Sequence, residues 1–408
     1  MVLQSTRWLA LGYFTYFFSY GIFLPFWSVW LKGIGLTPET IGLLLGAGLV
    51  ARFLGSLLIA PRVSDPSRLI SALRVLALLT LLFAVAFWAG AHVAWLMLVM
   101  IGFNLFFSPL VPLTDALANT WQKQFPLDYG KVRLWGSVAF VIGSALTGKL
   151  VTMFDYRVIL ALLTLGVASM LLGFLIRPTI QPQGASRQQE STGWSAWLAL
   201  VRQNWRFLAC VCLLQGAHAA YYGFSAIYWQ AAGYSASAVG YLWSLGVVAE
   251  VIIFALSNKL FRRCSARDML LISAICGVVR WGIMGATTAL PWLIVVQILH
   301  CGTFTVCHLA AMRYIAARQG SGLLCRCDGR QYRYHDRFRR FPVSISGPRR
   351  VLGNGAGGAS GNVFAPESCS LMLIRAFCGS APVDVLSASG PYRSAVVKRA
   401  VMAWYKAQ

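Results

Sequence analysis

Residues 8–31 read WLALGYFTYFFSYGIFLPFWSVWL, a run without a single charged side chain. The hydrocarbon core of a bilayer is about 30 Å thick, so a helix of about 20 apolar residues suffices to cross it. The run is too long for the apolar part of a secretory signal peptide, and it lacks an Ala-x-Ala cleavage pattern. It is therefore predicted to be a first transmembrane helix.

Further apolar runs of similar length follow as far as residue 317. The ten predicted spans are 8–31, 41–60, 69–88, 93–118, 133–151, 158–176, 207–230, 238–260, 269–289 and 292–317. The composition agrees with these spans, because 58% of the residues are hydrophobic and only 12% are charged, about half the charged share of a soluble protein. We predict an all-α polytopic membrane protein.

Lysine and arginine fall almost entirely on one side of these spans. The N-terminus and the loops on its side carry sixteen of them, whereas the alternate loops carry three, namely Lys32, Lys149 and Arg157. Short loops rich in Lys and Arg are retained in the cytoplasm. We therefore predict a cytoplasmic N-terminus.

The longest polar segment between spans divides the chain into two parts. Residues 177–206 are rich in Gln, Pro, Ser and Gly and are predicted to form a flexible cytoplasmic linker. The linker separates a six-helix half, 1–176, from a second half, 207–318, with four spans. Two parallel halves around a site at mid-membrane are a known transporter architecture. The second half is two helices short of that pattern.

Residues 319–408 form a basic tail rich in Gly, Arg and Ser that contains no run long enough to span a membrane. Three interpretations are open: a regulatory or RNA-binding tail, an ordinary disordered tail, or translation in the wrong reading frame. We favour the third, because two helices are missing where this segment begins, and we expect no nucleic-acid partner. Reading the encoding DNA in the other two frames after residue 320 would separate these interpretations.

Apart from the Lys and Arg counted above with the loops and span ends, five charged residues fall within the predicted spans: Arg52, Asp115, Arg133, Glu250 and Arg280. A charge at bilayer depth costs at least about 2.5 kcal/mol, so each is a candidate functional residue. Asp115 and Arg133 lie at equal distances from one polar turn, and Glu250 and Arg280 lie at equal distances from another. In each helical hairpin, the acid and the base can therefore lie at the same depth in the membrane. Structural ion pairs are the alternative, but neutral residues would pack at a lower desolvation cost.

Glu250 is the predicted proton carrier, because burial favours the uncharged form of a carboxylic acid. Arg52 is a second-tier candidate that could simply snorkel to the membrane surface, and His218 is a second-tier polar group in the seventh span. A metal site is not expected around His300 to His308, because Cys301 and His308 lie about 10 Å apart along one helix, too far to share one ion. No cofactor is predicted.

Four stretches carry a family resemblance: the first span, DYGKVRLWGSVAFVIGSALTGKL at 128–150, VVRWGIMG at 278–285 and VQILH at 296–300. They resemble the major facilitator superfamily, in particular its proton-symporter branch near lactose permease and nucleoside permeases. The resemblance implies that Asp115 and Arg133 contact substrate, and that Arg280 and His300 serve proton coupling.

The chain also departs from this family at the coupling site. Thr303 stands where the family has a proton-carrying glutamate, and Glu250 lies one turn beyond the eighth-span position that Val247 occupies here. We therefore expect a coupling site rebuilt around Glu250. The family's Gly-x-x-x-Asp loop is degenerate, with Pro61 at the position of the acid.

The resemblance implies a monomeric secondary transporter of the bacterial inner membrane, with spans one, four, seven and ten around its cavity. It implies import of a small aromatic carboxylate, similar to 3-phenylpropionate, with H⁺. The carboxylate would meet Arg133 or Arg280, and the ring would meet Tyr20, Trp27 or Tyr221. Transport of a nucleoside or sugar, drug export and an inactive or non-transporting truncated permease remain alternatives. No G-x-x-x-x-G-K-[ST] motif supports ATP-driven pumping, so the proton gradient is the expected driving force, and no enzymatic activity is expected.

Overall fold

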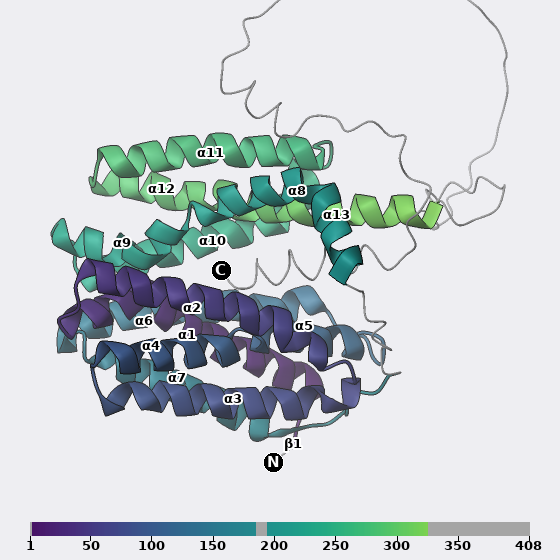
Figure 1. Cartoon of the computed structure of the whole chain (residues 1–408), viewed down its shortest axis with the longest axis horizontal. Coiled ribbons are helices and arrows are strands. Elements are labelled where there is room, and N and C mark those ends of the chain that lie inside the picture. The colour runs from purple at the N-terminus through teal and green to yellow at the C-terminus, as the bar shows by residue number, and fades with distance from the viewer. Residues whose placement is uncertain (1, 185–193, 325–408) are drawn as a thin grey trace, which may run out of the picture.

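The computed structural model describes residues 2–184 and 194–324, with side chains in the last helix as far as residue 317. Two sets of helices lie side by side, α1–α7 in purple to blue and α8–α13 in teal to green (Figure 1). Ten helical stretches of the described residues are long and apolar enough to cross a membrane. The predicted all-α polytopic class and its ten spans are therefore confirmed.

The first half contains seven helices, which Figure 1 shows in its lower part. They are α1 (Ser5–Gly33), α2 (Pro38–Leu58), α3 (Leu69–Ala86), α4 (Val93–Phe107), α5 (Leu110–Trp121), α6 (Tyr129–Phe154) and α7 (Val158–Leu175). Short 3₁₀ turns follow at Ala60–Arg62, Pro66–Arg68 and Phe87–Ala89. A parallel ladder of β1 (Val2–Leu3) and β2 (Arg177–Pro178) ties the N-terminus to the end of this half.

The second half contains six helices. They are α8 (Trp194–Gly216), α9 (Ala219–Ala231), α10 (Ala236–Leu260), α11 (Ala266–Ala286), α12 (Leu290–Thr303) and α13 (Thr305–Leu324). Helix α8 covers the end of the segment that the sequence predicts as a linker, and Asn204 interrupts its helical geometry. Helix α13 extends into the first residues of the predicted basic tail. The rest of that tail, 325–408, lies outside the described residues.

Three spans predicted as continuous helices are broken. The breaks lie at Ser108 and Pro109 between α4 and α5, at Ala217 and His218 between α8 and α9, and at Phe304 between α12 and α13. Proline has no amide hydrogen to continue a helix, which accounts for the first break. The second and third breaks contact each other, because the Gln215 side chain donates to the carbonyl of Phe304 at 3.4 Å. Broken helices leave backbone polar groups for such contacts.

Polar side chains set the starts of several helices. Thr37, Asp128, Ser235 and Ser265 each accept a hydrogen bond from a backbone amide in the first turn of α2, α6, α10 and α11. The amide of Lys131 and its ammonium group hold the pKa of the exposed Asp128 below its usual value. These caps fix where the spans begin.

The two halves approach most closely where the end of α6 meets the start of α10. A β-carbon added to Gly148 would lie 2.5 Å from the backbone oxygen of Ala236, and one added to Gly240 would lie 2.5 Å from that of Ser144. The Ser144 hydroxyl donates to the carbonyl of Gly240 at 3.1 Å. Small residues thus allow backbone-to-backbone packing between the halves.

Candidate functional site

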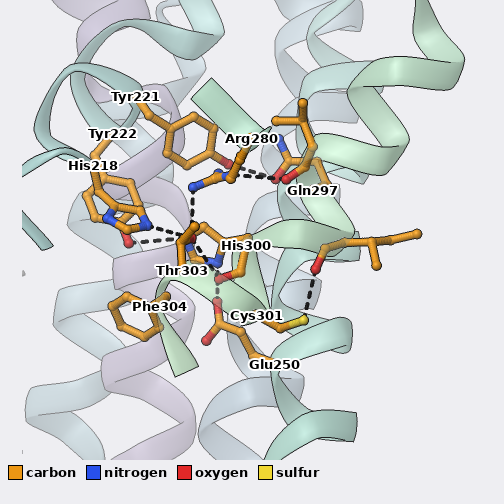
Figure 2. Close-up of polar contacts among 12 residues, drawn as sticks. His218, Tyr221, Tyr222, Glu250, Arg280, Gln297, His300, Cys301, Thr303 and Phe304 are labelled. Atoms are coloured by element: carbon orange, nitrogen blue, oxygen red, sulfur yellow. Dashed lines mark hydrogen bonds and ion pairs between the residues drawn. The ribbon is translucent and has the colours of Figure 1, made fainter. Parts of the chain in front are cut away.

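Glu250 on α10 contacts His300 on α12 in the interior of the second half (Figure 2). Oε1 of Glu250 lies 2.6 Å from Nδ1 of His300, and the two side chains are only 14% and 8% exposed. On the other side of the imidazole, the Tyr222 hydroxyl lies 3.2 Å from Nε2. Glu250, His300 and Tyr222 therefore form a continuous polar chain across three helices.

Arg280 is fully buried on α11 and is held by neutral groups. Its Nε donates to the carbonyl of Val296 at 2.9 Å and its Nη1 to the Thr303 hydroxyl at 3.3 Å. The guanidinium carbon lies 4.5 Å from the ring centre of Tyr221 and 4.4 Å from that of Trp281. Within the described residues, Nη2 has no hydrogen-bond partner.

In the described residues, Glu250 and Arg280 do not form the structural ion pair that their symmetric positions around the loop allow. In the described part of the chain, the carboxylate of Glu250 pairs with His300 and Arg280 forms no ion pair. Equal distance from a turn fixes depth in the membrane but not the direction in which a side chain leaves its helix. A residue from a third helix, His300, takes the place of the arginine.

Thr303 and His218 connect the breaks of the seventh and tenth spans. Nε2 of His218 lies 2.9 Å from the Thr303 hydroxyl, and Nδ1 lies 3.2 Å from the carbonyl of Gln215. The same Thr303 hydroxyl accepts from Arg280. Thr303 therefore serves as a neutral junction between the histidine and the arginine.

Asp115 and Arg133 lie in the first half and share Tyr13 as a neighbour. The hydroxyls of Tyr13 and Tyr129 donate to Oδ1 of Asp115 at 2.7 and 3.0 Å. The guanidinium carbon of Arg133 lies 5.3 Å from the ring centre of Tyr13 and 4.2 Å from that of Phe17. Two tyrosine hydroxyls thus contact the carboxylate of Asp115, and two aromatic rings face the guanidinium group of Arg133.

A cavity of about 240 Å³ lies between the two halves. Its walls come from α1, α2 and α4 of the first half and from α9 of the second, so the second span lines it in place of the expected tenth. The lining residues are Tyr20, Phe23, Leu24, Trp27, Ser28, Gly42, Leu45, Gly46, Gly48, Leu49, Arg52, Met100, Asn104, Ala219, Ala220, Tyr222, Gly223 and Phe224. Most of this surface is apolar or aromatic.

Arg52 faces this cavity, and the snorkelling interpretation of Arg52 is wrong. Its side chain is 3% exposed, and its guanidinium carbon lies 4.7 Å from the ring centre of Tyr20. Of the predicted ring contacts, Tyr20 and Trp27 line the cavity. Tyr221 does not; its hydroxyl donates to Gln297 at 2.8 Å, and its ring stacks on Trp243.

Sequence reasoning ranked Tyr222 only as a second-tier polar group and gave no role to Tyr129 or Gln297. Tyr222 was visible as half of a Tyr-Tyr pair, but only the helix orientation shows that it faces the cavity and Tyr221 the interior of the second half. Tyr129 looked like part of a turn, and Gln297 was hidden in an apolar run. The described residues contain no group of three or more His, Cys, Asp or Glu side chains able to hold a metal ion.

Comparison with known proteins assigns this arrangement to a family. The model of the "MFS_1 like family" matches residues 6–329. The chain belongs to this family. A "Probable 3-phenylpropionic acid transporter" of Escherichia coli (strain K12) is 99% identical over 324 residues, which cover 79% of this chain and 86% of that protein.

More distant relatives show the same fold. The "Putative nucleoside transporter YegT" of Escherichia coli (strain K12) is 26% identical over 294 residues, 69% of this chain and 68% of that protein. A crystal structure of nucleoside transporter NupG superposes with a TM-score of 0.61 at 14% identity, covering 78% of this chain and 83% of that one. The predicted bundle of the major facilitator type is confirmed, and the chain is a multi-pass membrane transporter rather than an enzyme.

Proposed function

We propose that this chain imports a small aromatic carboxylate, 3-phenylpropionate or a close analogue, together with a proton. One observation carries the proposal: the buried contact of 2.6 Å between Glu250 and His300, which Tyr222 connects to the cavity between the halves. A buried carboxyl group beside an imidazole can take up and release a proton. The printed name of the 99% identical relative supports the substrate class.

The chain of three side chains suggests a path for the proton. A proton on Nδ1 of His300 would lie next to the carboxylate of Glu250, 2.6 Å away, while Nε2 would accept from the Tyr222 hydroxyl. A proton arriving from the cavity at the Tyr222 oxygen lets the hydroxyl proton move to Nε2, while the Nδ1 proton moves to Glu250. The net result is a neutral Glu250, an imidazole in its other tautomer and no separated charge.

The cavity supports an aromatic substrate with a single ring. Its walls carry the rings of Phe23, Trp27 and Phe224, which offer stacking and edge contacts to a phenyl group. Its volume is slightly below the range of about 300–1,000 Å³ that is usual for ligand pockets. A small, mostly apolar cavity favours a phenyl-substituted acid over a sugar, whose many hydroxyls need many polar partners.

The remaining features of the transporter follow the sequence predictions. We propose that the chain works as a monomer in the bacterial inner membrane, with a cytoplasmic N-terminus and without a cofactor. The excess of Lys and Arg on one side of the spans supports this orientation. Asp115 and Arg133 would then contact the substrate from the first half. Arg280 would stabilise the polar chain of Glu250, His300 and Tyr222.

Uptake of labelled 3-phenylpropionate into proteoliposomes that contain the full chain tests the proposal. We expect accumulation that requires an inwardly directed proton gradient and that collapses when a protonophore is added. Uptake that is independent of the gradient would reject symport. If unlabelled uridine, maltose or drug-like cations compete as strongly as unlabelled 3-phenylpropionate, the proposed substrate class is rejected. A lack of any uptake would favour the non-transporting alternative.

A further inference from the structure

We infer that Arg52 anchors the carboxylate of the substrate and that the ring lies in the cavity between α1, α2, α4 and α9. The inference rests on the proposed function, because it takes an aromatic carboxylate as the ligand. It moves the anchoring role away from Arg133 and Arg280, which the sequence favours, to a residue on the second span.

The charge of the cavity points to an anion. Of the described residues that line it, Arg52 alone carries a formal charge. A guanidinium group at the wall of a mostly apolar cavity attracts an anion and can donate two parallel hydrogen bonds to a carboxylate. The ring of Tyr20, which lies 4.7 Å from the guanidinium carbon, holds the Arg52 side chain along the cavity wall.

The shape of the cavity leaves room for a ring beside that charge. Gly42, Gly46 and Gly48 contribute to the wall from α2, the helix that carries Arg52. A β-carbon added to Gly46 would meet nothing within 4 Å, so this part of the wall is open. Trp27 and Phe224 supply aromatic surface from the two halves. A substrate held here would touch both halves, as a transported ligand must.

The other two arginines are less suited to the role. Arg280 is fully buried, and two of its nitrogens already donate to Val296 and Thr303. Arg133 lies beside Tyr13 and Phe17, which are not among the residues that line the cavity. Neither arginine is among the residues that line the cavity.

Two neutral side chains of the wall are suited to complete the site. The Ser28 hydroxyl and the Oδ1 atom of Asn104 are buried and have no hydrogen-bond partner within the described structure. Buried polar atoms are normally satisfied, so such a pair beside a cavity is consistent with a ligand or water that bridges them. A serine hydroxyl can rotate to donate to a carboxylate oxygen.

Equilibrium binding to the purified full chain in detergent tests the inference without requiring a transport cycle. Calorimetry at pH 7.5 would compare 3-phenylpropionate with 3-phenylpropionamide, which has the same ring and chain but no charge. The variants are Arg52→Gln and Arg52→Lys, with Arg62→Gln as an exposed arginine control. Gly46→Leu adds bulk at a glycine that lines the cavity, and Gly282→Leu is its control, because a β-carbon there also meets nothing within 4 Å and Gly282 does not line the cavity.

We expect the unaltered chain to bind the acid at least tenfold more tightly than the amide. Arg52→Gln should lower affinity for the acid by about tenfold or more and leave affinity for the amide nearly unchanged, with Arg52→Lys between the two. Gly46→Leu should weaken both ligands, and both controls should bind like the unaltered chain. If Arg52→Gln fails to fold, the two ligands and the Gly46→Leu variant still decide the matter.

The outcomes separate the inference from the proposed function. If the unaltered chain binds the acid and the amide equally, or if Arg52→Gln keeps full affinity for the acid, the anchoring role is overturned while aromatic-acid transport stands. Unchanged binding to Gly46→Leu would overturn the cavity as the site. If the unaltered chain binds neither ligand and accumulates no 3-phenylpropionate, the proposed function fails, and the inference fails with it.

Discussion

Replacement of Glu250 by glutamine should uncouple transport from the proton gradient. Glutamine has almost the same shape and keeps an oxygen that can accept from Nδ1 of His300, now 2.6 Å from Glu250, but it cannot bind a proton. Exchange of external for internal 3-phenylpropionate should continue, because exchange requires no net release of a proton. Accumulation against a gradient should stop.

The proton gradient sets the expected loss of accumulation, and the contact between Glu250 and His300 sets the expected loss of stability. One proton per substrate at a gradient of one pH unit supplies about 1.4 kcal/mol, which sustains about tenfold accumulation. The Glu250→Gln variant should therefore accumulate no more than the external concentration. Its stability should fall by only about 1 to 2 kcal/mol, because a neutral hydrogen bond replaces a charge-assisted one.

Proteoliposomes with an acidic exterior would measure accumulation, and counterflow would measure exchange in the same preparations. Glu39→Gln is the matched control, since Glu39 is an exposed acid in the first turn of α2 and its replacement should leave accumulation near tenfold. Undiminished accumulation by Glu250→Gln would refute the role of Glu250 as proton carrier. Loss of exchange together with accumulation, in a variant that melts like the original, would show that Glu250 serves binding instead.

Two further substitutions test the surroundings of this pair. Tyr222→Phe keeps the ring in the cavity wall but removes the hydroxyl that lies 3.2 Å from His300, so the rate of proton-driven uptake should fall about tenfold, and more than substrate affinity does; equal rates would contradict the proposed proton path. Gly240→Ala places a methyl group 2.5 Å from the backbone oxygen of Ser144 and should cost about 1–3 kcal/mol, measured as a lower melting temperature, whereas Gly282→Ala, in open space, should not destabilise the chain.

The number and order of the spans could be predicted from the sequence, because each apolar run carries its own signal. Every predicted span overlaps a helical stretch of the structure, and the second starts only three residues earlier than expected, where Thr37 caps α2. The breaks in the fourth, seventh and tenth spans could not be predicted in this way. At 304 no proline or charged residue marks the break, and the compensating contact from Gln215 comes from another span.

The candidate site was predictable as a set of residues but not as a set of contacts. A charge in an apolar run stands out, so Glu250, Arg280 and Arg52 were found. Their partners depend on helix rotation and on which helices are neighbours, and neither is encoded within one span. For this reason the sequence could place Glu250 and Arg280 at a common depth but could not show that Glu250 contacts His300, and it favoured Tyr221 over Tyr222 as a site residue, whereas Tyr222 lines the cavity.

Tyr222 belongs to both parts of the proposed mechanism. It lines the cavity between the halves, and its hydroxyl contacts the imidazole that pairs with Glu250. An anion beside Arg52 and a proton on Glu250 would therefore act on the same hydroxyl from opposite sides. If the substrate shifts Tyr222 when it binds, it also changes the hydrogen bonding of His300, and by linkage the protonation of Glu250 changes substrate affinity equally. Coupling of this kind needs no long pathway, because one side chain belongs to both sites.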